Sequence, residues 1–192
     1  MRLVLGLGNP GRRYARTRHN VGVRVVEELA RRHGIGLDRE RHRARYGTGR
    51  IGRVPVLLAT PLTYMNLSGE AARPLMRYHG LGPGEIIVVH DEADLLPGTV
   101  RIKQGGGIAG HNGLRSLVEH LGTREFTRVR VGIGRPPGGE LPMADWVLTT
   151  PPPDEAAALA EGIERAADAV EAILALGVEA AMTRFNRRDA AE

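Results

Sequence analysis

Short apolar runs alternate with amphipathic stretches along most of the chain. Residues 3–7 and 86–90 are almost wholly apolar, which is typical of strands that are buried on both faces of a parallel sheet. Similar patterns between glycine and polar turns predict further strands at residues 44–51, 54–60, 99–103 and 128–133, with a short one at 146–148.

Helical periodicity fills most of the intervals between these strands. Apolar positions at helical spacing predict helices over residues 20–33, 68–79, 113–121, 154–176 and 178–186. Asn20, Ser68 and Asn112 are suitable N-cap residues for the first three of these helices. Pro74 lies inside the second helix, which predicts a kink or a later start there.

Strands that alternate with helices predict the fold class. We expect a single-domain, three-layer α/β/α sandwich over residues 1–192, in which the central sheet is mixed and mostly parallel. Ligands of such sheets bind just beyond the carboxyl ends of the strands. Functional residues are therefore expected in the segments that follow residues 3–7 and 86–90.

The composition excludes several kinds of site. The chain has 192 residues and no cysteine, which excludes disulfides, thiolate nucleophiles and zinc sites built on cysteine. It also has no apolar run of about 18 residues, and its first residues do not resemble a signal peptide. We therefore expect a cytoplasmic protein that does not cross a membrane.

Positive charge is concentrated in the first third of the chain. Residues 1–53 contain 14 arginines and four acidic residues, whereas the remaining residues carry a net negative charge. A strongly basic segment is expected of a protein that binds a polyanion such as a nucleic acid. Lys103 is the only lysine, however, so a coding bias toward arginine is an alternative explanation.

A glycine-rich motif, GLGNPG, occupies residues 6–11 and has the spacing of the dinucleotide-binding fingerprint. That fingerprint requires a helix to begin at the glycines, so that the helix N-terminus faces the pyrophosphate. Here residues 12–19 have no apolar helical stripe, and the predicted helix begins only after Asn20. The sequence therefore disfavours nicotinamide binding and favours a tight turn that presents Asn9.

Ionisable residues follow the predicted strand at residues 86–90. His90, Asp91, Glu92 and Asp94 stand at its carboxyl end, where they could hold a metal ion or where a carboxylate could orient a histidine. The chain has no H-x-H, H-x-x-x-H or H-E-x-x-H pattern to supply paired imidazole ligands. A solvated turn is a third interpretation of this cluster.

Other polar residues lie next to predicted helices. Asn66 and Asn112 could each cap a helix, or could direct a side-chain amide toward a carbonyl oxygen or an oxyanion. His19 lies at the start of the first helix. Ser68 and Ser116 are the only serines and neither lies in a G-x-S-x-G motif, so the sequence excludes a serine nucleophile of that type.

In this order, the motifs resemble those of bacterial peptidyl-tRNA hydrolases. The resemblance extends over nearly the whole chain and rests on residues 6–11 (GLGNPG), Tyr14, 17–22 (TRHNVG), 61–69 (PLTYMNLSG), 90–92 (HDE), Leu95 and 110–113 (GHNG). Residues 108–109 (IA), Pro74 and Arg101 depart from the family's usual pattern.

The resemblance implies an enzyme that hydrolyses the ester between a peptide and the terminal ribose of tRNA, which recycles tRNA from prematurely released peptidyl-tRNA. It implies that peptidyl-tRNA is the partner, that no cofactor or metal takes part and that the protein is a monomer. It also implies that His19 is the general base that activates water, and that Asp91 holds and polarises His19.

Substrate contacts follow from the same resemblance. Asn9 would check that the amino group is acylated, while Asn66 and Asn112 would bind the peptide and the developing oxyanion. The other residues expected at the substrate and the tRNA end are Tyr14, Tyr64, Met65 and His111. Arg101, Lys103 and Arg130 are further candidates, for contacts with tRNA phosphates.

The chemistry is consistent with these residues. An ester has a better leaving group than an amide, so a positioned base and an oxyanion site can suffice. Two alternatives stay open. One is a metal-dependent amidase or phosphoesterase built on the five residues His90, Asp91, Glu92, Asp94 and His111. The other is a non-catalytic RNA-binding protein, which the low aromatic content of 4% disfavours.

Overall fold

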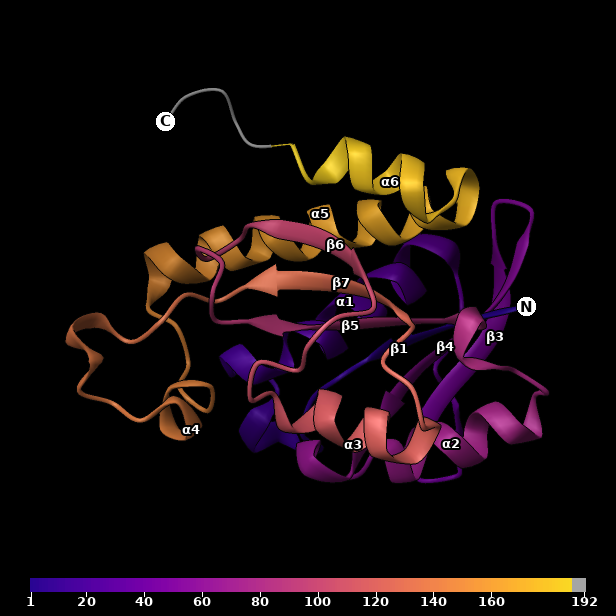
Figure 1. Cartoon of the computed structure of the whole chain (residues 1–192), viewed down its shortest axis with the longest axis horizontal. Helices are drawn as coiled ribbons and strands as arrows, with labels where there is room; N and C mark the ends of the chain where they lie inside the picture. The colour runs from indigo at the N-terminus through magenta and orange to yellow at the C-terminus, as the bar shows by residue number, and fades with distance from the viewer. Residues whose placement is uncertain (188–192) are drawn as a thin grey trace.

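A seven-stranded sheet lies between two layers of helices in the computed structural model, which describes residues 1–187 (Figure 1). The strands are β1 (Arg2–Gly6), β2 (Arg39–Arg41), β3 (Ala44–Ile51), β4 (Val54–Pro61), β5 (Ile86–Glu92), β6 (Val100–Gln104) and β7 (Thr127–Gly132). The helices are α1 (Val21–His33), α2 (Ser68–Tyr78), α3 (Asn112–Leu121), α4 (Met143–Trp146), α5 (Pro153–Leu176) and α6 (Val178–Phe185).

The sheet is mixed, as predicted. Its strand order is β2-β3-β4-β1-β5-β7-β6. The four central strands, β4, β1, β5 and β7, run parallel to one another, whereas the three pairings toward the edges are antiparallel. The carboxyl ends of β1 and β5 therefore lie side by side at one edge of the sheet.

Apolar side chains on the two faces of β1 belong to two separate clusters. Val4 packs with residues of α1 and α5 on one face, while Leu3 and Leu5 pack with residues of α2 and α3 on the other. All three side chains are fully buried, which explains why β1 is a continuous apolar run rather than an alternating one. Helices cover both faces, so the three-layer prediction is confirmed (Figure 1).

Two expectations about secondary structure are wrong. Residues 146–148 form no strand, because the N–H groups of Trp146 and Val147 bond to the carbonyls of Pro142 and Met143 in the turn of α4. A run of three apolar residues is too short for periodicity to distinguish a strand from a helical turn. The short edge strand β2 was not predicted, since all three of its residues are exposed and polar.

Helix starts also differ from the predicted ones. Ser68 and Asn112 are the first residues of α2 and α3, and the N-cap positions belong to Leu67 and His111. Asn20 occupies the N-cap position of α1, but its side chain makes no capping bond. Helix α2 begins well before Pro74, so the later start is wrong.

The prediction that the chain has no membrane-spanning segment can be compared with the structure for the described residues. No helix within residues 1–187 is long and apolar enough to span a membrane. The last five residues of the single domain expected over 1–192 lie outside the part of the chain that the structure describes.

Glycines allow α1 to approach the sheet closely. A Cβ at Gly22 would lie 2.3 Å from the carbonyl oxygen of Val89 and 2.9 Å from the backbone nitrogen of Leu7. Both contacts are to backbone atoms of the central part of the sheet, which cannot move without disturbing its hydrogen bonds. Close packing at Gly22 therefore fixes the position of the start of α1.

We expect Gly22→Ala to lower the free energy of unfolding by about 3 kcal/mol, at the upper end of the range for overpacked sites. Gly84→Ala is the matched control, because a Cβ there would meet nothing within 4 Å. Chemical denaturation of both variants measures the effect. Equal stability of the two variants would contradict the packing argument.

Candidate active site

The candidate site lies at the carboxyl ends of β1 and β5. After β1, the chain makes two 3₁₀ turns, Arg12–Tyr14 and Arg18–Asn20, within the segment expected to be a loop. The second turn carries His19, and β5 carries Asp91. Helix α1 follows β1 on one face of the sheet and α2 follows β4 on the other, which leaves a crevice at these strand ends.

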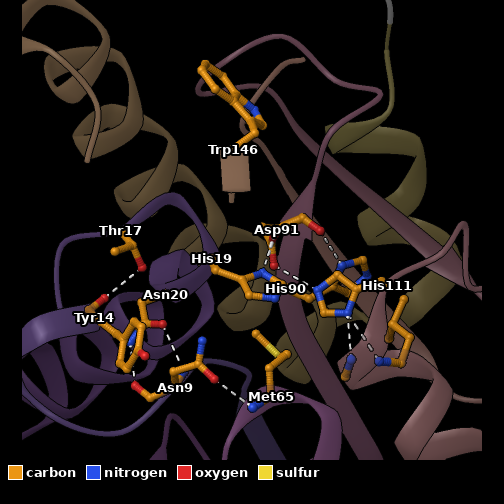
Figure 2. A network of polar contacts seen from close by, with 12 residues as sticks. Asn9, Tyr14, Thr17, His19, Asn20, Met65, His90, Asp91, His111 and Trp146 are labelled. Carbon is orange, nitrogen blue, oxygen red and sulfur yellow. Dashed lines mark hydrogen bonds and ion pairs between the residues drawn. The ribbon is translucent and has the colours of Figure 1, made fainter. Parts of the chain in front are cut away.

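His19 and Asp91 form a buried pair (Figure 2). The Nδ1 atom of His19 lies 2.7 Å from Oδ2 of Asp91, and the two residues are 8% and 3% exposed. Because the carboxylate accepts the proton on Nδ1, the neutral imidazole has its lone pair on Nε2. That atom is the free basic group of the site.

His111 bonds to the second oxygen of the same carboxylate. Its Nε2 lies 2.8 Å from Oδ1 of Asp91, while its Nδ1 accepts the backbone N–H groups of Gly113 and Leu114 at 3.1 and 3.2 Å. These two amides begin α3, and they require Nδ1 to be unprotonated. His111 is therefore a neutral donor to Asp91, with a tautomer that the helix N-terminus fixes.

The electrostatics of the pair favour the protonated form of His19. Burial lowers the pKa of His19, but the charge of Asp91 and its hydrogen bond outweigh burial, so the pKa is raised above its ordinary value of 6.5. The pKa of Asp91 is held far below its ordinary value, because the attraction of His19 and the hydrogen bonds from His19 and His111 outweigh the burial of the carboxylate. Asp91 is therefore ionised throughout the range in which His19 titrates.

His90 is not available as a second base. Burial of the ring is the main cause that lowers its pKa to about 3. Its Nδ1 bonds to the backbone oxygen of Asp91 at 2.8 Å, so the ring is neutral and tied to the strand. His90 is therefore not a general base activated by the neighbouring carboxylates.

Among the described residues, His19, Asp91 and His111 are the group whose ligand atoms lie close enough to hold a metal ion, within 4.8 Å of one another. A ligating histidine usually donates its second ring N–H to an acceptor. Here the second nitrogen of His111 faces two N–H donors instead, so metal binding at Nε2 would place a proton against them. The residues therefore fit a proton-transfer pair better than a metal site. Asp94, one of the acids that the sequence suggested as a possible metal ligand, pairs with Arg135.

Asn9 and Asn20 join the segments around the site. The Asn20 side chain accepts the N–H of Asn9 at 2.9 Å and donates to its carbonyl oxygen at 2.8 Å, which explains why it does not cap α1. Oδ1 of Asn9 accepts the N–H of Met65 at 2.7 Å. The GLGNPG motif thus holds two loops together, and the helix begins after it, as expected.

Only some of the predicted substrate residues line the cavity that His19 and Asp91 also line. Asn112 is exposed and lines it, whereas Asn66 is exposed in the 3₁₀ turn Met65–Leu67 and does not line it. The rings of Tyr14 and Tyr64 contact edge to face with centroids 6.4 Å apart. Tyr64 is 59% exposed, so an aromatic surface lies beside the Asn9 loop.

A cavity of about 340 Å³ contains His19, Asp91 and His111. Its other lining residues come from four segments of the chain and are Glu92, Ala93, Asp94, Ile108, Ala109, Gly110, Asn112, Arg135, Met143, Ala144 and Val147. The unusual pair Ile108 and Ala109 is part of this wall, and Ala109 has a positive φ of 46°. The cavity therefore combines a polar base pair with an apolar side.

A second cavity of about 330 Å³ lies next to the first and shares Glu92, Asp94, Ile108 and Ala109 with it. Lys103 and Arg130 line it, whereas Arg101 does not and bonds to backbone carbonyls, including that of Phe185 in α6. Arg101 is the cross-strand partner of Arg130 in the β6–β7 pairing, and it differs from the other two candidates because its guanidinium bonds to these carbonyls and does not line the cavity.

Two features of the site were not predicted. Sequence reasoning gave His111 a substrate role, whereas the structure places it on Asp91. Arg18, next to His19, is 2% exposed and stacks on Trp146. Trp146 lies 128 residues away along the chain, and no spacing pattern connects the two.

Comparisons with known proteins find chains similar to this one over nearly its whole length. The family model described as peptidyl-tRNA hydrolase matches residues 3–192. Peptidyl-tRNA hydrolases of Syntrophomonas wolfei and Chloroflexus aurantiacus are 48% and 49% identical to this chain; each alignment covers 97% of this chain, with 100% and 99% of the relative. The crystal structure of the Acinetobacter baumannii peptidyl-tRNA hydrolase has a TM-score of 0.92 and 39% identity, covering 100% of this chain and 97% of that one.

We expect His19 to titrate above pH 6.5, and Asp91→Asn to lower its pKa because the amide removes the negative charge. An NMR titration of the His19 imidazole measures both values. Glu171→Gln, which removes a carboxylate that pairs with His33 away from the site, is the control and should leave His19 unchanged. An unchanged His19 pKa in Asp91→Asn would contradict the assigned electrostatics.

Proposed function

Because this chain belongs to the peptidyl-tRNA hydrolase family, we propose that His19 and Asp91 are the residues that carry out the hydrolysis. The chain is a hydrolase of the ester that joins a peptide to tRNA. The observation that carries the residue assignment is the buried bond of 2.7 Å between His19 Nδ1 and Asp91 Oδ2, which leaves Nε2 as the base.

In the first step, Nε2 of His19 takes a proton from water as the water oxygen attacks the ester carbonyl. The imidazolium that forms is stabilised by the Asp91 carboxylate, which stays ionised. In the second step, the bond between the carbonyl carbon and the ribose oxygen breaks, and His19 returns the proton to that oxygen. The products are a tRNA with a free ribose hydroxyl and a peptide with a free carboxylic acid, which loses its remaining proton to solvent.

Asparagine amides can stabilise the charge that develops on the carbonyl oxygen. Asn112 supports this role because it lines the cavity beside His111. The Asn9 side chain uses its oxygen to hold Met65, so its nitrogen is the group that can donate to the peptide. Asn66 and the rings of Tyr14 and Tyr64 extend the proposed binding surface for the peptide and the tRNA end.

His111 acts on Asp91 in this proposal, in addition to lying against the substrate cavity. A single neutral donor on Oδ1 orients the carboxylate so that Oδ2 faces His19. Since His111 is neutral, it does not compete with His19 as the charged partner of Asp91. We expect it to be a positioning residue.

Phosphate binding is proposed for the second cavity. Lys103 and Arg130 line this second cavity, which shares part of its wall with the catalytic cavity. Arg128, which is 1% exposed, donates to the carbonyls of Gly106, Gly107 and Arg124 and holds the glycine loop in place.

We further propose that the protein acts as a monomer in the cytoplasm, where its substrate arises during translation.

We expect the wild type to release tRNA from N-acetyl-aminoacyl-tRNA in the presence of EDTA. His19→Ala should lower kcat by about a hundred- to ten-thousand-fold, the usual contribution of a positioned base, and should still bind tRNA. Asp91→Asn should lower kcat less, since it weakens the base without removing it. The activity should fall as the pH decreases through the raised pKa of His19, because the base must be neutral.

His33→Ala is the matched control, since His33 pairs with Glu171 outside the site. Cleavage that requires added metal would support the metal-dependent alternative. No cleavage under any condition would support an RNA-binding protein without catalysis. A loss in Asp91→Asn that equals or exceeds the loss in His19→Ala would contradict the division of roles.

We expect Lys103→Gln and Arg130→Gln each to weaken tRNA binding and to reduce the slope of log affinity against log salt by about one. Arg101→Gln should change the slope less, because its side chain bonds to backbone carbonyls. Titrations of tRNA at several salt concentrations measure the slopes. Equal slopes for Arg101→Gln and Lys103→Gln would contradict the assignment of the second cavity.

A further inference from the structure

A buried arginine lies beside the catalytic histidine and takes no part in the proton transfer described above. The Arg18 guanidinium lies 3.6 Å from the centroid of the Trp146 ring. Its Nη1 donates to Oγ1 of Thr149 at 2.6 Å, and its Nη2 donates to Oε2 of Glu155 at 2.7 Å. One side chain thus joins the turn that carries His19, the end of α4 and the first turn of α5.

The backbone of the same turn holds the same segment. The N–H of Arg18 donates to the carbonyl of Thr149 at 3.1 Å, and the N–H of His19 donates to the carbonyl of Val147 at 2.8 Å. The segment from Trp146 to Thr149 is therefore in contact with the backbone of the catalytic base itself. A shift of this segment away from the turn would break these two hydrogen bonds.

This segment also forms one wall of the catalytic cavity. Met143, Ala144 and Val147, which come from α4 and the residue after it, line the cavity together with His19. They are the apolar lining residues on that side, facing a substrate that carries a peptide. The position of α4 therefore sets the width of the space in which the peptide lies.

Helix α4 is too short to hold this position by itself. It has four residues, and a single helical turn is unstable without tertiary contacts. The Trp146 indole is fixed on its other side, because its Nε1 donates to the carbonyl of Gly134 at 2.8 Å. Arg18 therefore holds the ring at its face, and Gly134 holds it at its edge.

We propose that Arg18 and Trp146 form a latch that positions the α4 wall of the cavity against the turn carrying His19, and that Arg18 is a positioning residue for peptide binding. The role requires an arginine. A planar guanidinium can stack on the indole while its two terminal nitrogens reach Thr149 and Glu155, which a lysine ammonium cannot do together. The proposal rests on the hydrolase function, since the cavity is taken as the peptide site.

Trp146 is the only tryptophan in the chain, so its fluorescence reports the latch without any assay of activity. We expect Arg18→Lys to increase the quenching of Trp146 by acrylamide, because the ring loses its cover. With N-acetyl-aminoacyl-tRNA as substrate, KM should rise by about tenfold, the effect of one stacked cation, while kcat stays close to that of the wild type. The pKa of His19 should be unchanged, since its bond to Asp91 is kept.

Arg165→Lys is the matched control, because Arg165 lies over the ring of Phe185 outside the cavity. It should change neither KM nor the quenching of Trp146. The double variant Arg18→Lys/Trp146→Leu should have a KM no higher than the larger of the two single variants, as expected for two halves of one contact. If Arg18→Lys does not fold, Glu155→Gln, which keeps the arginine, should give a smaller rise in both readouts.

Three results would overturn the latch. They are unchanged quenching and KM in Arg18→Lys, a fall in kcat with unchanged KM, which indicates loss of folded enzyme, and additive effects in the double variant. These results differ from failure of the proposed function. If the wild type cleaves no ester, the fluorescence of the same variants still decides whether Arg18 covers Trp146.

Discussion

The shared Asp91 carboxylate is the interaction on which the rest of the site depends. Each of its two oxygens accepts a hydrogen bond from a different histidine. His111 keeps the proton that it donates, whereas His19 takes up and releases a proton at its Nε2. The tautomer of His111 is set by the first amides of α3, so the polarity of a helix N-terminus is transmitted through Asp91 to the base. A reversed ring at His111 would leave Oδ1 without its donor and the carboxylate free to rotate.

This chain of hydrogen bonds requires three separate segments to meet within a few ångströms. His19 follows β1, Asp91 is the next-to-last residue of β5, and His111 precedes α3. Their meeting depends on close packing as well as on the polar contacts of Asn9, Asn20 and Arg18. Gly22 lets α1 approach the backbone of Leu7 and Val89, and at Gly113 a Cβ would lie 2.6 Å from Met65 Sδ. A larger residue at either position would separate the loops that carry the site.

The sequence predicts the elements whose signal is local. The long apolar strands and the amphipathic helices were found because burial on one or both faces imposes a period on the chain. Motif resemblance added His19 and Asp91, although nothing in one sequence places residues 19 and 91 together. The roles of His111, Asn20 and Arg18 escaped prediction because each depends on a partner that the fold brings near. Trp146 was misassigned because its segment is held by Arg18 rather than by a pattern of its own.

The arginine-rich first third shows the same limit for charge. Along the chain it suggests one polyanion-binding surface, but in three dimensions several of its cations meet acids of their own. Arg18 pairs with Glu155, Arg32 with Glu28 and Asp168, and Arg43 with Glu70. Some arginines of the first third therefore form ion pairs that join this segment to α2 and α5. We propose that specific phosphate recognition depends instead on the cavity lined by Lys103 and Arg130, because that cavity adjoins the proposed base, which acts on the end of the tRNA.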